Sequence, residues 1–359
     1  MPGGRRGRGE GEGPGGPGGP GAPAALCVAA GGAGAPLAVG TEGGGVRLWD
    51  PRVAGAGAGA GFPGLGEVPA VCFHPAADGR RLFAGAGARV LELDLRRAGS
   101  GAGPVRAFEW SRDEVNQVAV NSKGTLLAAA DDSGEVVVVD LGQGELQKRL
   151  RGGHDNICGS VQFRLRRPWE VVSGGLDCRV VRWDFAKGRA VGVLPMEGGS
   201  GGDDVGGGRV FNPPMAHSVS TAGARDVAHL VAVGRGDGVV GVYDLDAETR
   251  APKAGVKAAP PKRRLFGREA GGHRSGVSHA TFLELSGEHR VLSVGNDRRL
   301  ILWDWQAEPG ADRGPKIWEA RHNCVANWAC PVPGTHSVAV ADVTGDVRLY
   351  ALDSPGGAG

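Results

Sequence analysis

The chain lacks an excess of charge, long apolar runs and paired cysteines, and each lack excludes a class of protein. Its 359 residues carry a net charge of +2, which gives no overall electrostatic reason to bind nucleic acid or a membrane surface. No run of about 18 apolar residues could span a membrane, and the first residues are Gly, Pro and Arg rather than the apolar centre of a secretion signal. We therefore expect a soluble intracellular protein of the cytoplasm, the nucleus or both, without a membrane partner.

The sequence also lacks the motifs of metal, nucleotide and catalytic sites. None of the six cysteines forms a C-x-x-C pair, and several fall within expected strands, so we expect buried free thiols and no metal site. A phosphate loop of the GxxxxGK[ST] type is missing, and no paired acid and base stand out among the carboxylates. We expect no cofactor and no catalysis.

Glycine and proline are abundant: 67 and 23 residues, a quarter of the chain. Much of this excess lies in 1–23, 51–66 and 197–208. Residues 1–23 bury too little apolar surface to offset the entropy of ordering, so we expect a disordered Gly/Pro/Arg-rich leader. The remainder divides into a folded domain over 24–352 and a short flexible tail over 353–359.

A repeat runs through the folded domain. VSGGLDCRVVRWD at 172–184 and LSVGNDRRLILWD at 292–304 match in length, in their Ser, Asp and Trp positions, and in closing on Trp-Asp. Weaker copies end near residues 50, 94, 140, 244 and 351, so the closing residue recurs every 44 to 60 positions. Periods near 40 to 45 with a Trp-Asp signature are typical of four-stranded propeller blades, and the longer intervals carry insertions. The sequence predicts an all-β, seven-bladed propeller.

Two places in this architecture are weak. Most closing motifs precede an outer strand, but PRVAGAGAGAGFPGLG at 51–66 is a poor strand for blade one. In addition, no convincing strand before Ala24 could serve as the fourth strand of blade seven. The sequence therefore leaves open how the ring closes at its last blade.

Blades four and six each contain a His, a Ser, an Asp and a Trp at matched spacing. The indole N–H can donate to Ser, Ser to His, and His to the carboxylate, which satisfies polar groups buried between blades. A hydrolase triad is the alternative, but the set recurs in two structural repeats, whereas a nucleophile needs one exposed copy beside an oxyanion hole. We interpret both sets as structural tetrads: His154, Ser173, Asp177 and Trp183, and His273, Ser293, Asp297 and Trp303.

The insertion at 248–271 is basic, with six Lys and Arg residues between 253 and 268. It could be a nuclear localisation patch or a loop that contacts nucleic-acid phosphates. A solvated loop running into a basic outer strand is the interpretation we favour, which makes nucleic acid an unlikely partner.

The best candidate for a partner site lies at the exit of the third strand in the first two blades. Arg52 and Arg96 each follow the closing Asp by two residues, and should project from one rim of the ring. The planar five-donor head of Arg suits protein contact. Lys and Arg number 41 of 359 residues, so this spacing is weak evidence by itself.

The repeats resemble the WD-repeat family throughout 24–352, and five segments point to one particular member: ADDSGEVVVVDL, HDNICGSVQFRLRRP, VVSGGLDCRVVRWD, NPPMAHSVS and GHRSGVSHATFL. The resemblance implies a non-enzymatic scaffold that acts as a substrate receptor of cullin-4 RING ubiquitin ligases. In that group a WD-x-Arg box docks on the large damaged-DNA-binding adaptor subunit, and a protein substrate binds elsewhere. The box would be formed here by Trp49, Asp50 and Arg52, with Asp94 and Arg96 as a second copy in which Leu93 replaces Trp.

Overall fold

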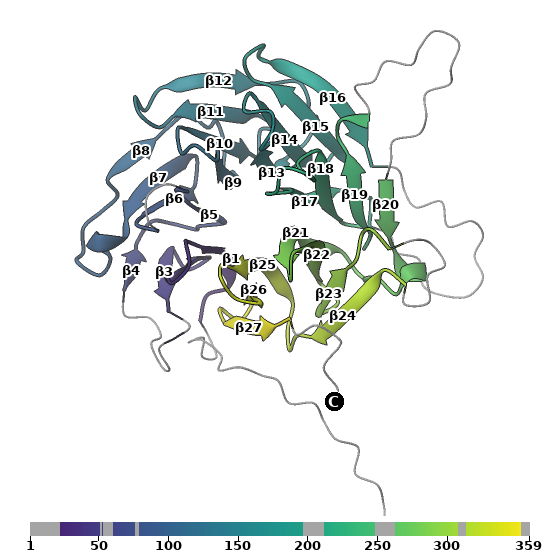
Figure 1. Ribbon diagram of the computed structural model, residues 1–359. Coiled ribbons are helices and arrows are strands. Elements are labelled where there is room, and N and C mark those ends of the chain that lie inside the picture. The colour runs from purple at the N-terminus through teal and green to yellow at the C-terminus, as the bar shows by residue number, and fades with distance from the viewer. Residues whose placement is uncertain are drawn as a thin grey trace, which may run out of the picture.

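The computed structural model describes residues 22–50, 52, 60–75, 79–196, 212–247, 263–307 and 314–352. Over these ranges the chain forms seven antiparallel sheets arranged as a ring, with short 3-10 turns and no α-helix (Figure 1). The predicted seven-bladed all-β propeller is confirmed. Among the residues so placed, no helix has the length and apolarity needed to cross a membrane.

Each sheet is one blade, and its strands follow chain order from the centre of the ring outwards (Figure 1). Blade one has β1 (Ala25–Ala30), β2 (Leu37–Thr41), β3 (Gly45–Trp49) and β4 (Gly61–Pro63); blade two has β5 (Ala70–Phe73), β6 (Arg81–Ala86), β7 (Arg89–Asp94) and β8 (Arg106–Phe108). Blade three has β9 (Val115–Val120), β10 (Leu126–Asp131), β11 (Val136–Asp140) and β12 (Leu146–Leu150); blade four has β13 (Cys158–Phe163), β14 (Glu170–Gly175), β15 (Arg179–Asp184) and β16 (Arg189–Pro195).

The remaining blades follow the same plan. Blade five has β17 (Ala216–Thr221), β18 (Leu230–Arg235), β19 (Val240–Asp244) and β20 (Arg263–Phe266); blade six has β21 (Val277–Leu285), β22 (Glu288–Gly295), β23 (Arg299–Trp303) and β24 (Lys316–Arg321). Blade seven has β25 (Ala326–Val332), β26 (Ser337–Asp342) and β27 (Val347–Ala351).

Blade one corrects the sequence prediction for its outer strand. β4 is only three residues long, yet it pairs with β3 from Gly45↔Pro63 to Arg47↔Gly61. Phe62 is 3% exposed and packs in the cluster between blades one and two, so one aromatic anchor holds an otherwise Gly-rich segment in the sheet. A composition-based expectation misses such a strand because backbone pairing and one buried ring are sufficient to form it.

Blade three illustrates how the local sequence determines the strands and turns of a blade. Val136 to Val139 are fully buried, as expected of a β-branched strand with both faces covered. Gly124 (φ 70°) and Gly134 (φ 78°) occupy the left-handed region in the turns on either side of β10, which glycine adopts without strain.

Neighbouring blades are joined by polar contacts between their inner strands. Ser160 on β13 donates to Gln117 Oε1 on β9 (2.6 Å) and accepts from the Val219 amide on β17 (2.8 Å). Ser218 on β17 accepts from the Ala280 amide on β21 (2.9 Å). These hydroxyls satisfy backbone groups at blade edges that would otherwise be buried without a partner.

The ring closes by packing of blade seven on blade one. Within the described ranges blade seven has three strands, so no fourth strand fastens it. Instead Trp49 and Val28 of blade one pack against Ala339 and Val347 of blade seven in one buried cluster. Asn327 also donates to the Ala25 carbonyl (2.9 Å), and Arg47 to the Gly345 carbonyl (2.6 Å). Among the described residues, apolar burial and two backbone-directed hydrogen bonds therefore hold this junction together.

Candidate protein-binding rim and the polar networks behind it

The rim site begins where β3 leaves the core of blade one. Asp50 accepts three hydrogen bonds from Arg52: from its backbone amide (3.0 Å), from Nε (2.9 Å) and from Nη2 (2.7 Å). The Arg52 side chain is 62% exposed. Trp49, by contrast, is 8% exposed and lies in the closure cluster, so Asp50 and Arg52 present the surface of this motif.

Blade two repeats the same arrangement at the exit of β7. Asp94 accepts from the Arg96 amide (3.0 Å), from Nε (2.9 Å) and from Nη2 (2.5 Å), and the Arg96 side chain is 70% exposed. The short 3-10 turn η1 (Leu95–Arg97) begins at this pair, with Asp94 as its cap. Gly99 then donates to the Gly61 carbonyl of β4 (3.0 Å), which holds this loop against blade one.

In blades three and five the closing Asp also caps a turn, but it does so through backbone amides alone. Asp140 accepts from the amides of Gly142 (2.8 Å) and Gln143 (2.9 Å), and Asp244 accepts from those of Asp246 (2.9 Å) and Ala247 (3.1 Å). Turn capping is thus a property of the repeat, whereas a fork between the closing Asp and an Arg two residues later occurs, in the described residues, in blades one and two.

Electrostatics keep both forks charged. The Arg52 guanidinium, bonded to Asp50, lowers the pKa of that carboxyl to about 2, and Arg96 lowers the pKa of Asp94 to about 2 in the same way. The bidentate contact holds each guanidinium in one orientation while most of the head stays in solvent. The rim therefore presents two oriented cationic groups on adjacent blades.

The predicted tetrad residues lie together in both blades. In blade four, Trp183 Nε1 donates to Ser173 Oγ (2.7 Å), His154 Nε2 contacts the same oxygen (2.7 Å), and His154 Nδ1 lies 3.0 Å from Asp177 Oδ1. Burial lowers the pKa of His154, which favours the neutral ring. The serine oxygen is fully committed to buried partners, so it is not placed to attack a substrate.

Blade six repeats the network almost atom for atom. Trp303 Nε1 donates to Ser293 Oγ (2.9 Å), which His273 Nε2 contacts at 2.8 Å, and His273 Nδ1 lies 2.8 Å from Asp297. Trp303 has no exposed surface and stacks on Phe266 of blade five at 5.0 Å between ring centroids. The network therefore also ties one blade to the next.

Sequence reasoning missed the corresponding network of blade seven. His322 Nδ1 lies 2.6 Å from the Tyr350 hydroxyl, and its Nε2 lies 2.8 Å from Asp342 Oδ2. Tyr takes the place of Trp here, and the Asp lies on β26 rather than in the turn after it. The sequence signals this network only through His322 and through Tyr350, which follows Asp342 by eight residues. In the tetrads the aromatic residue follows the Asp by six residues, so the tetrad spacing does not find this network.

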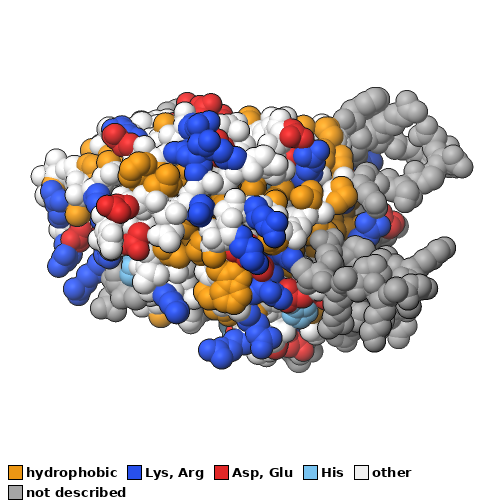
Figure 2. All heavy atoms as spheres, turned by 90° about the horizontal axis from the view of Figure 1, so that it is seen from above, with side chains coloured by type: hydrophobic (Ala, Val, Ile, Leu, Met, Phe, Trp, Pro, Cys, Tyr) orange, Lys and Arg blue, Asp and Glu red, His pale blue; other side chains and the backbone are white. Residues whose placement is uncertain are grey.

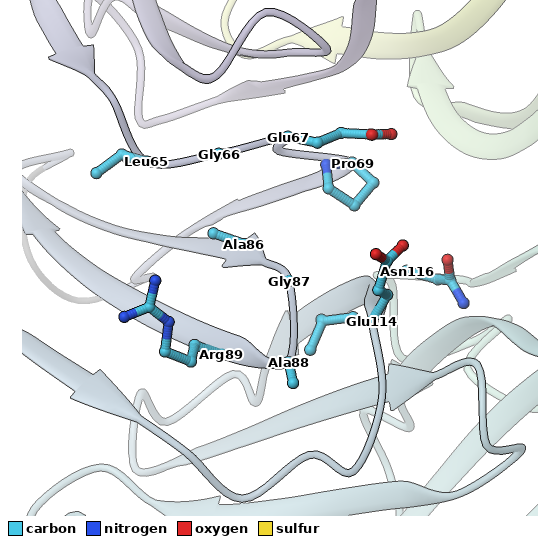
Figure 3. Close-up of a pocket in the computed structure, with 11 residues that line it drawn as sticks. Leu65, Gly66, Glu67, Pro69, Ala86, Gly87, Ala88, Arg89, Glu114 and Asn116 are labelled. Atoms are coloured by element: carbon cyan, nitrogen blue, oxygen red, sulfur yellow. The ribbon is translucent and has the colours of Figure 1, made fainter.

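A cavity of about 540 Å³ opens at the opposite ends of the blades from the rim (Figure 3). It is lined by the turns that lead into β5 and β9 and by the β6–β7 turn, whereas Arg52 and Arg96 follow third strands. Gly66, Gly87 and Ala88 supply little side-chain volume, which leaves the space open. Glu67 and Glu114 lie on one side of it and Arg89 on the other (Figure 3). The cavity therefore combines apolar walls with charged side chains of both signs.

The outer edge of the ring carries many basic side chains on the side of blades two to four (Figure 2). Three arginines surround the nearly buried Glu135: Arg112 (3.1 Å), Arg149 (3.0 Å) and Arg151 (3.0 Å). Of the basic segment 253–268, residues 253–262 lie outside the described residues. Arg268 donates to the Arg274 carbonyl (2.8 Å) from η3 (Arg268–Ala270).

Comparisons with known proteins agree with this architecture. No family model matches the chain. The chain is similar to "WD repeat-containing protein 53 homolog" of Dictyostelium discoideum, with 24% identity over 358 residues that cover 91% of each protein. This confirms the resemblance to WD repeat-containing protein 53 on which the five sequence segments converge. Among solved structures it resembles the WD40 β-propeller domain of Doa1, with a TM-score of 0.69 and 15% identity over 92% of this chain and 94% of that one. That likeness supports the fold.

Proposed function

We propose that this chain is a non-enzymatic protein-interaction scaffold: a substrate receptor that docks on the adaptor of a cullin-4 RING ubiquitin ligase. The docking surface is the rim formed by Asp50, Arg52, Asp94 and Arg96. The adaptor is the large damaged-DNA-binding subunit implied by the WD-x-Arg resemblance, and a protein substrate binds on another face.

One observation carries the proposal: the same exposed Asp–Arg fork stands at equivalent positions on two adjacent blades. Exposed arginines usually sample many orientations, and binding would then cost side-chain entropy. Here each guanidinium is already oriented by two hydrogen bonds to a carboxylate, so less freedom is lost on contact. Arginine is also enriched among residues that dominate protein interfaces.

The cavity lined by Glu114 and Arg89 is where we place the substrate contact. It lies at the other ends of the strands from the rim, so an adaptor and a substrate could bind at once without competing. We further propose an intracellular location, in the cytoplasm, the nucleus or both, because all six cysteines are free, as expected in a reducing compartment.

The test measures binding of the purified full-length chain to the purified adaptor subunit. Replacing Arg52 and Arg96 together by Ala should weaken binding by about 30-fold or more, the loss typical of truncating one interface hot spot. The matched control replaces Arg80 and Arg97, two exposed arginines of the same rim, and removes the same charge. Equal losses in both variants would show only a general charge effect and would contradict the proposal.

Chromatin or nucleic-acid binding through 253–268 is the alternative, and the six Lys and Arg residues of that segment are the observation that favours it. It predicts that affinity for duplex DNA falls steeply with added salt. Replacing Lys253, Lys257 and Lys262 should then weaken DNA binding and leave adaptor binding unchanged, so the two functions are separable by experiment.

A further inference from the structure

Blade seven gathers three side chains that can ligate a metal. His322, Cys324 and Asp342 each offer one ligand atom, and these atoms all lie within 4.8 Å of one another. The His322 and Asp342 side chains are 0% and 1% exposed, whereas Cys324 is half-buried. The cluster therefore has an enclosed pair of ligands and one ligand that a metal ion can reach from solvent.

The surrounding groups orient these ligands as the outer shell of a metal site does. The Tyr350 hydroxyl holds His322 Nδ1 at 2.6 Å, which turns Nε2 towards Asp342. Thr344 donates to Asp342 Oδ1 from its amide (2.8 Å) and its hydroxyl (2.6 Å), so Oδ2 is the oxygen that faces the ring. Such second-shell hydrogen bonds fix the ring and carboxylate orientations of metal ligands.

Comparison with the tetrads shows what is specific to blade seven. The position two residues after the histidine is Asn156 in blade four and Ser275 in blade six, but Cys324 here. The tetrads of blades four and six have no thiol at this position, whereas here a thiol lies beside the same carboxylate that the histidine contacts.

We propose that His322, Cys324 and Asp342 form a Zn²⁺ site with three protein ligands and a fourth position open to solvent. Nitrogen, thiolate and carboxylate are the ligand types that Zn²⁺ prefers, and their mutual closeness suits a tetrahedral ion. The site would tie the loop before β25 to the end of β26, next to the junction that closes the ring.

Binding of Zn²⁺ to this site releases one proton. The thiol proton of Cys324 leaves to solvent as the Zn–S bond forms. The ring proton moves from Nε2 to Nδ1, so that Nε2 can ligate the ion and the Tyr350 hydroxyl becomes an acceptor. The two positive charges of Zn²⁺ are then balanced by one thiolate and one carboxylate. The site is neutral overall, which suits a largely buried position.

Cobalt reports directly on the thiolate. Titrating the full-length chain, freed of any purification tag, with Co²⁺ should produce a thiolate-to-cobalt charge-transfer band that added Zn²⁺ abolishes. Cys324→Ser should lose the band and bind Zn²⁺ more than about 100-fold more weakly, beyond the loss typical of a second-shell change. The matched control is Cys178→Ser, another half-buried thiol beside a tetrad carboxylate, which should keep the band.

Tyr350→Phe provides a second test of the Zn²⁺ site. It removes the group that orients Nδ1 but no ligand, so it should keep the band and lower Zn²⁺ affinity by about 10-fold. Circular dichroism would verify that each variant is folded. A wild-type chain without the band, or a band that persists in Cys324→Ser, would overturn the proposal; neither result bears on the rim.

Discussion

Ser173→Ala is the sharpest test of how this propeller is held together. The substitution removes one oxygen, yet that oxygen serves both Trp183 Nε1 and His154 Nε2 at 2.7 Å. All three side chains have no exposed surface, so water cannot take its place. The change therefore leaves two buried polar nitrogens without a partner.

The magnitude follows from the number of groups left unpaired. Each buried polar group without a partner costs roughly 1–3 kcal/mol, so Ser173→Ala should lower the free energy of unfolding by about 4 kcal/mol. With an unfolding entropy of about 2.1 cal/mol/K per residue over roughly 280 ordered residues, this corresponds to a fall in melting temperature of about 7 °C. Ser293→Ala should give a similar fall, because blade six has the same contacts.

Calorimetry and urea unfolding measure the effect, and a serine at the surface controls for it. Ser278 donates to Asn296 in an exposed hydrogen bond, so water can replace its hydroxyl and Ser278→Ala should change stability by less than about 0.5 kcal/mol. A melting temperature for Ser173→Ala within about 1 °C of the wild type would refute the account of the tetrads as buried, mutually dependent networks.

Two further predictions concern backbone strain and pH. Gly134→Ala should destabilise the chain by more than about 1 kcal/mol in urea unfolding, because φ is 78° and the new Cβ would lie 2.7 Å from the Asn156 carbonyl oxygen; Gly103→Ala, with no atom within 4 Å, should be close to neutral. Burial lowers the pKa of His279 to about 3, so the native state binds fewer protons than the unfolded chain and stability is lost as pH falls from about 6.5 towards 3. His279→Phe has no proton to bind here and can keep the stacking on Trp328. Between pH 6.5 and 5 its free energy of unfolding should therefore fall by about 2 kcal/mol less than that of the wild type. Equal falls in the two proteins would contradict a neutral, buried His279.

The blade pattern was predictable because it depends on local spacing. The Ser, Asp and Trp positions at 173, 177 and 183 repeat at 293, 297 and 303. Antiparallel pairing of β14 with β15 sets Ser173 opposite Val181, so Trp183 is its diagonal neighbour on the same face of the sheet. The period of the closing motif then counts the blades. Local order of this kind is visible in one sequence.

Other parts depended on contacts that no local pattern carries. β4 forms because Phe62 finds a buried position between two blades. The closure contact from Asn327 to the Ala25 carbonyl joins residues 302 positions apart. In blade seven, Asp342 precedes Tyr350 by eight residues, so the tetrad spacing does not find it, and Cys324 joins the cluster only in three dimensions.

The rim lies between these cases. The sequence showed that Arg52 and Arg96 each follow the closing Asp by two residues. The hydrogen-bonded fork that orients each guanidinium forms only in the folded turn. The same Asp caps turns in other blades through backbone amides alone, so the sequence motif by itself does not distinguish a capped turn from a presented arginine.

Closure by packing has a consequence for the order of the blades. Each described sheet is built from one continuous stretch of chain, and none borrows a strand from the other end. Within the described residues, the junction between blades seven and one is therefore formed, like the other junctions, by apolar packing and side-chain hydrogen bonds between neighbouring blades. Circular permutants that join the present ends and open the chain between two other blades would keep every described strand pairing, so we expect this ring to tolerate a different starting blade.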